Sequence, residues 1–222
     1  MRDSFHEDLD RISDQLVEMT RLAASAMSRA TTALLDADLA LAESVISADQ
    51  EIDRMRYELE ELAVELLARQ QPVATDLRIV VTALHMGSSL ERMGDLAEHV
   101  AKVARMRYPN SAIPPVIRDT IVSMGHIADN LVLQAGAVIA GKDVDAAKNL
   151  DMEDDEMDAL HRRVFTIVAS EEWDLPTDVA VDVTLLSRYY ERFADHAVSV
   201  ARQVNFLVTG ERRVFGGVEP QA

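Results

Sequence analysis

Apolar residues recur in this chain at steps of three and four, which is the spacing of one face of an α-helix. One such stripe runs from Leu9 to Leu34 and a second from Ala42 to Leu66. Aromatic residues make up only 5% of the chain, and glycine and proline are few. This composition favours helices over a sheet. The pattern therefore predicts an all-α protein built from long amphipathic helices.

Polar breaks and prolines divide the first half into three predicted helices. In chain order, the expected boundaries are an N-cap at Ser4 paired with Glu7, a break at 36–38, an end near Arg69 before Pro72, a cap at Thr75, and an end near Met106. Pro109, Pro114 and Pro115 prevent the third helix from continuing.

The second half repeats this layout, with helices expected from about Val116 to Ala140, Val144 to Ala169 and Thr177 to Val208. Glu91-Arg92-Met93-Gly94-Asp95 matches Glu191-Arg192-Phe193-Ala194-Asp195 at the same place in each half. Such self-similarity predicts two tandem three-helix bundles related by an internal repeat. The expected domains are a first bundle at 1–107, a linker at 108–115, a second bundle at 116–210 and a disordered tail at 211–222.

Charge and composition exclude several classes of function. The formal net charge of −17 repels the phosphates of nucleic acids, so direct nucleic-acid binding is not expected. The chain has no cysteine, which excludes disulfides, thiol catalysis and cysteine-ligated metals. No stretch resembles a signal peptide or a membrane-spanning helix. We therefore expect a soluble, cytoplasmic protein that reaches a membrane only through its partners.

Glu91 and Asp95 are four residues apart, so their side chains are neighbours on one face of a helix, and Glu191 and Asp195 repeat the pair. A divalent cation such as Mg²⁺, Mn²⁺ or Fe would relieve their mutual repulsion and use their oxygens as ligands. His99 lies one turn beyond Asp95. The alternative is a solvated acidic face, because duplication of a structural helix would copy the pair as well.

Asp49 and Asp154 interrupt the apolar stripe of the second helix in each half. A buried carboxylate needs a partner. One possibility is a hydrogen bond or an ion pair to Arg78 or Arg92; the other is a contribution to a metal site on the neighbouring third helix. His99 and His196 occupy different motif positions, which by itself favours surface histidines over metal ligands.

Motifs of enzymes are absent from the sequence. There is no glycine-rich phosphate loop, no G-x-S-x-G and no H-E-x-x-H. No glutamate is followed by histidine three residues later, which argues against the di-iron sites of helical bundles. We expect no catalytic residues.

Three segments carry a recognisable pattern, and they are Gln-Pro-Val-Ala-Thr-Asp-Leu-Arg at 71–78, Leu-Glu-Arg-Met-Gly-Asp-Leu-Ala at 90–97 and Arg-Tyr-Tyr-Glu-Arg-Phe-Ala-Asp-His-Ala at 188–197. They resemble the PhoU family, and the likeness extends over about residues 5–208. The resemblance implies a homodimer of paired three-helix bundles with metal clusters at the E-x-x-x-D motifs. It also implies a cytosolic negative regulator of phosphate uptake and of the phosphate-starvation response. Such a regulator links the ATPase of a phosphate-specific ABC transporter to a sensor histidine kinase. The resemblance implies no catalytic activity.

Carried over by position, the resemblance assigns metal ligands to this chain. The main ligands are Glu91, Asp95, Glu191 and Asp195, with Asp49, Asp53, Asp154 and Asp158 as possible additions from the second helix of each half. His99 and His196 are further candidates only because they lie near the carboxylate pairs, and the resemblance does not assign them. The metal would be Fe, Mn, Mg or Zn. Family motifs usually continue with an asparagine near the positions held here by His99 and Ser199, so the ligand set can differ from that of other members.

Three functions are compatible with these residues. A signalling adaptor predicts metal binding without turnover, a carboxylate-bridged metalloenzyme requires a pocket and open coordination positions, and a purely structural helical interaction protein predicts no stoichiometric metal. The resemblance favours the adaptor.

Overall fold

The computed structural model describes the backbone of residues 2–211, with side chains from residue 7 onward except at 148, 151 and 152. The predicted tail therefore lies outside the described residues, except for its first residue. Six helices account for the fold. They are α1 (Arg2–Asp36), α2 (Leu39–Gln70), α3 (Ala74–Arg107), α4 (Pro115–Gly141), α5 (Val144–Val168) and α6 (Thr177–Thr209).

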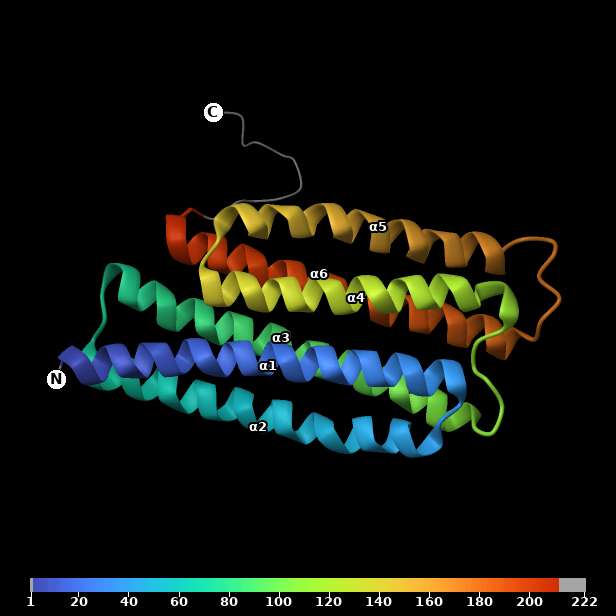
Figure 1. The fold of residues 1–222 in the computed structure, drawn as a ribbon, viewed down its shortest axis with the longest axis horizontal. Helices are drawn as coiled ribbons and strands as arrows, with labels where there is room; N and C mark the ends of the chain where they lie inside the picture. Colours follow the sequence, from blue (N-terminus) through green and yellow to red (C-terminus); the bar gives the residue numbers. More distant parts are fainter. Residues whose placement is uncertain (1, 212–222) are drawn as a thin grey trace, which may run out of the picture.

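The helices form two three-helix bundles lying side by side along their length (Figure 1). Helices α1, α2 and α3 pack on one another, as do α4, α5 and α6. Between the bundles, α1 contacts α4 and α3 contacts α6, whereas α2 and α5 contact only helices of their own bundle. The prediction of an all-α fold with two tandem three-helix bundles is confirmed, and the third helix of each half faces its counterpart.

The predicted breaks between α1 and α2 and between α4 and α5 have the same local structure. Ala37 and Lys142 both have φ of 51°, a left-handed conformation that ends the preceding helix. Asp38 then caps α2 by accepting from Leu41 N at 3.0 Å, and Asp143 caps α5 by accepting from two backbone N–H groups. The internal repeat therefore extends to the turn between the first and second helices.

Two predicted caps were wrong. Ser4 lies inside α1, because the helix already begins at Arg2 and neither glycine nor proline precedes Ser4 to stop it. Thr75 lies in the first turn of α3, whose N-cap is Val73, and its hydroxyl accepts from Arg78 Nη2 at 3.1 Å instead of capping. Pro115 belongs to α4, where proline at the first position loses no helical hydrogen bond.

The core is one hydrophobic cluster to which all six helices contribute. Tyr190 and Phe193 of α6 are the largest fully buried side chains. The hydroxyl of Tyr190 lies 2.7 Å from Thr31 Oγ1 of α1, so a hydrogen bond joins the two bundles inside this core. Gly136 of α4 lies directly against Thr20 of α1, which brings these two helices close together. These contacts of α1 with α4 and α6 join the two bundles, and α3 packs against α6 within the same core.

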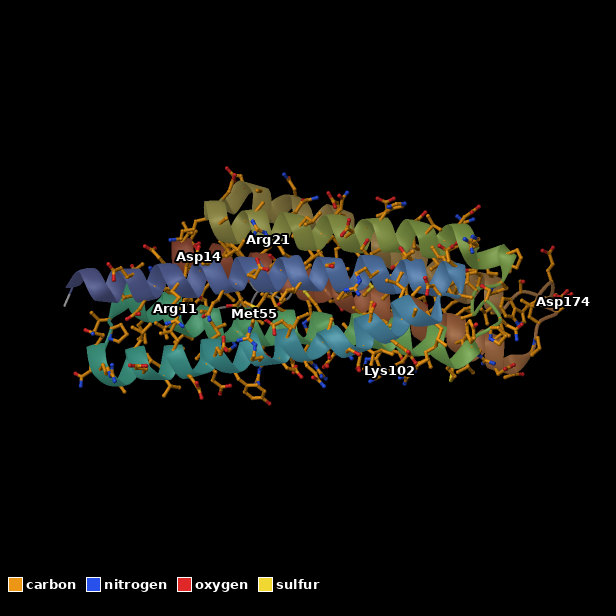
Figure 2. All side chains as sticks on the ribbon, turned by 60° about the horizontal axis from the view of Figure 1, so that its bottom comes forward. Arg11, Asp14, Arg21, Met55, Lys102 and Asp174 are labelled. Carbon is orange, nitrogen blue, oxygen red and sulfur yellow. The ribbon has the colours of Figure 1, made fainter. Side chains whose placement is uncertain are left out.

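Charged side chains cover the outside of the molecule (Figure 2). Arg11, Asp14 and Arg21, for example, are exposed on α1. Among the described residues, none of the helices combines the length and the hydropathy needed to cross a bilayer.

Candidate metal and anion sites on the two third helices

The predicted carboxylates of the first half gather between α2 and α3. Glu91 and Asp95 are half-buried on α3, and Asp49 and Asp53 are half-buried on α2. A fifth carboxylate, Glu98, lies on the same face of α3 as Glu91 and Asp95, because the three residues are separated by four and three positions. We call these five residues the first acidic cluster.

Gly94 allows Asp49 to lie directly against α3. A Cβ atom at position 94 would be 2.6 Å from Asp49 Oδ1, which is closer than van der Waals contact allows. Burial raises the pKa of Asp49 to about 7, and the neighbouring charges of Glu98, Asp53, Asp95 and Glu91 add to this rise. Asp49 is therefore a crowded carboxylate that needs a proton or a cation to neutralise it.

An arginine partner for Asp49, one of the two possibilities considered above, is not found among the described residues. Arg78 donates to Thr75, and Arg92 forms an ion pair with Asp95. The environment of Asp49 is instead made of other carboxylates. This arrangement agrees with the second possibility, a contribution from α2 to a site on α3.

Glu91 also has a raised pKa. Burial is the largest cause and the charge of Asp95 the next, whereas Arg56 and Arg92 act in the opposite direction. Glu98 forms an ion pair with Lys102, one turn further along α3. Glu98 was not among the predicted site residues, although its spacing from Glu91 and Asp95 is a signal in the sequence that places it on their face.

The second half builds a related but different cluster from Glu191 and Asp195 of α6 and Asp158 of α5. Glu191 is only 8% exposed, and burial raises its pKa, with a further rise from Asp195. Its Oε1 accepts from Arg188, but its Oε2 is buried without a hydrogen-bond partner. Burial and then Asp158 likewise raise the pKa of Asp195, while Arg188 lowers it.

Three substitutions at equivalent positions explain why the clusters differ. Arg188 in the second half stands where the first half has Ser88, so only the second cluster contains this cation. Val198 replaces Glu98, which removes one carboxylate. Ala194 replaces Gly94, so the second half has a methyl group at the position where the first half has none and Asp49 lies against α3. Asp154 and Asp158, the predicted contributions from α5, are half-buried and exposed respectively.

The chemistry of both clusters suits a cation. A buried glutamate oxygen without a partner and a carboxylate with a pKa near 7 are features that an oxygen-ligated metal ion would satisfy. Within the described part of the chain, however, no three acidic or imidazole groups already converge in metal-binding geometry. The structure brings the predicted residues of the first half together without assembling a complete coordination sphere.

The two histidines meet where α3 packs against α6, in a cavity that is also lined by Asp95 of the first acidic cluster. His99 of α3 is exposed and lies against Tyr189 of α6, with the ring centroids 5.2 Å apart. His196 of α6 lines the same cavity as His99. Burial lowers the pKa of His196, and Arg192 and Arg92 lower it further through their positive charge, whereas Asp195 raises it. Their different motif positions are therefore no obstacle to a shared site, because α3 packs against α6.

The fold and the paired carboxylates define a class: tandem helical-bundle proteins with one E-x-x-x-D motif on the third helix of each bundle. A family model described as the PhoU domain matches twice, at residues 16–104 and 121–204. These two matches cover most of the chain, and the chain belongs to the PhoU family.

Relatives and solved structures support this membership. The phosphate-specific transport system accessory protein PhoU homolog 2 of Mycobacterium tuberculosis (strain H37Rv) is 50% identical over 95% of this chain and 99% of its own length. Homolog 1 of Mycobacterium leprae is 47% identical, covering 95% of each chain. The crystal structure of PhoU from Pseudomonas aeruginosa superimposes with a TM-score of 0.84 at 29% identity, covering 93% of this chain and all of the other.

Proposed function

We propose that this chain is a cytoplasmic regulator of a phosphate-specific transport system. Relatives that are accessory proteins of such a system match it over 95% of its length at 50% identity. This match, with both E-x-x-x-D motifs in place, carries the proposal.

In this role the protein acts as a negative regulator of phosphate uptake and of the phosphate-starvation response. It is a homodimeric adaptor that contacts the ATPase of the transporter and a sensor histidine kinase. The long helices and the shared core support a rigid scaffold of this kind. Such a scaffold acts by binding partners through its surfaces, without catalytic groups.

Co-purification tests this role. The full chain carrying an affinity tag is expected to retain the transporter ATPase and the kinase from cells grown at high phosphate, and to release at least the kinase at low phosphate. A control variant with Arg21→Gln, on an exposed face away from both clusters, should behave like the wild type. Retention of neither partner at either phosphate level would refute the adaptor function.

We further propose that the acidic clusters bind metal ions, from among Fe, Mn, Mg and Zn. The ligands would be Glu91, Asp95, Asp49 and Asp53 in the first cluster, and Glu191, Asp195, Asp158 and Asp154 in the second. A bound cation would add positive charge to clusters in which carboxylates outnumber their ion-paired cations, and in the first cluster its ligands would come from both α2 and α3. The first cluster should bind more tightly, because it contains Glu98 and lacks an equivalent of Arg188.

The metal proposal makes a separate prediction. In protein purified with Mn²⁺ or Fe, Glu91→Ala combined with Asp95→Ala should remove at least half of the bound metal, measured by elemental analysis. Glu191→Ala combined with Asp195→Ala should remove less, because the wild-type second site binds more weakly. Metal content that neither pair of substitutions changes would show that these clusters are only solvated or protonated carboxylates.

A further inference from the structure

A cavity of about 240 Å³ lies between α3 and α6, at the junction of the two repeats. Arg92, Asp95 and His99 line it from α3, and Tyr189, Arg192 and His196 line it from α6. One buried water needs only ~10–15 Å³, so the cavity has room for a ligand of several heavy atoms.

Helix geometry explains how these side chains meet. Positions 92, 95 and 99 fall on one face of α3, and positions 189, 192 and 196 fall on one face of α6, since each set is spaced at three and four residues. The packing of α3 against α6 brings the two faces together. Arg92 and Arg192 are equivalent residues of the repeat, so the cavity receives one guanidinium from each half.

The cavity is positively charged, although the chain as a whole carries a formal charge of −17. Asp95 is its single carboxylate, and it forms an ion pair with Arg92. Arg192 forms no ion pair with any side chain that the structure describes, so its charge is uncompensated. The two guanidinium groups also lie close enough to His196 to influence it electrostatically.

This set of hydrogen-bond donors and positive charges is suited to binding a small oxyanion. Guanidinium groups donate paired hydrogen bonds to the oxygens of a phosphate, and imidazole and phenol groups can donate further ones. A carboxylate in such a site repels a fully deprotonated anion but accepts a hydrogen bond from one that still carries a proton. Asp95 would therefore favour hydrogen phosphate over sulfate and over the dianion of a phosphate monoester.

We propose that the cavity between α3 and α6 is a binding site for inorganic phosphate, held by Arg92 and Arg192 and selected through Asp95. A ligand here bridges the two bundles, because each contributes one arginine. The proposal deepens the proposed function, and its meaning for signalling rests on that function. Binding itself is measured on the purified chain alone, so failure to bind phosphate and failure to bind partners are separate results.

Titration calorimetry of phosphate into the full chain, freed of metal with a chelator and kept at pH 7.5 and constant ionic strength, tests the site. We expect saturation at one phosphate per chain and affinity at least tenfold weaker in Arg192→Gln. Arg21→Gln is the matched control, because it removes the same charge from an exposed position on α1 and should leave the affinity unchanged. Circular dichroism confirms that each variant is folded.

Selectivity gives an independent test. Sulfate and glycerol phosphate should bind at least tenfold more weakly than phosphate to the wild type, and Asp95→Asn should reduce this difference. Absence of saturable phosphate binding by the folded wild type would overturn the proposal. So would an equal loss of affinity in Arg192→Gln and Arg21→Gln, since this would mean that only net charge matters.

Discussion

Replacing Asp49 with asparagine tests the electrostatics of the first acidic cluster directly. The ordinary pKa of this carboxyl group is 3.8, and in the folded chain it is raised to about 7. A group whose pKa is raised by folding favours the folded state at pH below its unfolded value, and this contribution is lost as the pH rises through the folded value. The window for Asp49 is therefore about pH 4 to 7.

The magnitude follows from ~1.36 kcal/mol for each pKa unit. The raised pKa of Asp49 disfavours the folded, metal-free chain by about 4 kcal/mol at pH 8, where the folded carboxylate is ionised, and by about 2 kcal/mol at pH 5, where folding requires the carboxylate to take up a proton. Asparagine has the same shape and carries no charge. The gain in the free energy of unfolding caused by Asp49→Asn should therefore be about 2 to 3 kcal/mol larger at pH 8 than at pH 5.

Urea denaturation followed by circular dichroism, in the presence of a chelator at pH 5, 6, 7 and 8, measures this difference. Asp14→Asn is the control, because Asp14 is exposed on α1 and lies outside both clusters (Figure 2). Saturating Mn²⁺ should reduce the advantage of the asparagine variant, since a bound cation neutralises the wild-type carboxylate. A difference between Asp49→Asn and the wild type that stays constant from pH 5 to pH 8 would refute the reasoning.

Two further predictions concern the junction between the bundles, and both are measured by urea denaturation. Gly136→Ala should lower the free energy of unfolding by ~1–3 kcal/mol, because the new Cβ would lie 2.6 Å from Thr20 Oγ1; Gly141→Ala, which meets nothing within 4 Å, should be neutral or slightly stabilising. Arg107→Ala should cost ~1–3 kcal/mol, because it leaves the buried carboxylate of Asp182 without its ion-pair partner. Asp182→Asn in the Arg107→Ala background should recover part of that loss, and no recovery would mean that the unpaired charge is not the cause.

Local sequence signals predicted the helices accurately. The break at 36–38 and the boundaries of α5 and α6 fell within about one residue of those observed, because proline, left-handed turn residues and capping aspartates act within a few residues of the helix end. The two errors, Ser4 and Thr75, were residues able to cap a helix that lie inside its first turn. A capping side chain is chemically suitable at several neighbouring positions, and the sequence alone does not say which one is used.

The sequence by itself determined that two equivalent helices each present a carboxylate pair, because the spacing of Glu91 and Asp95 and its repetition are properties of a single helix. Only the tertiary structure decided how each pair is completed. Gly94 admits Asp49 to the first cluster, and this contact depends on the distance between α2 and α3. The meeting of Arg92 and Arg192 in one cavity depends on the register of α3 against α6. Helical periodicity says which residues share a face, but only the packing of the core sets which faces meet and at what depth.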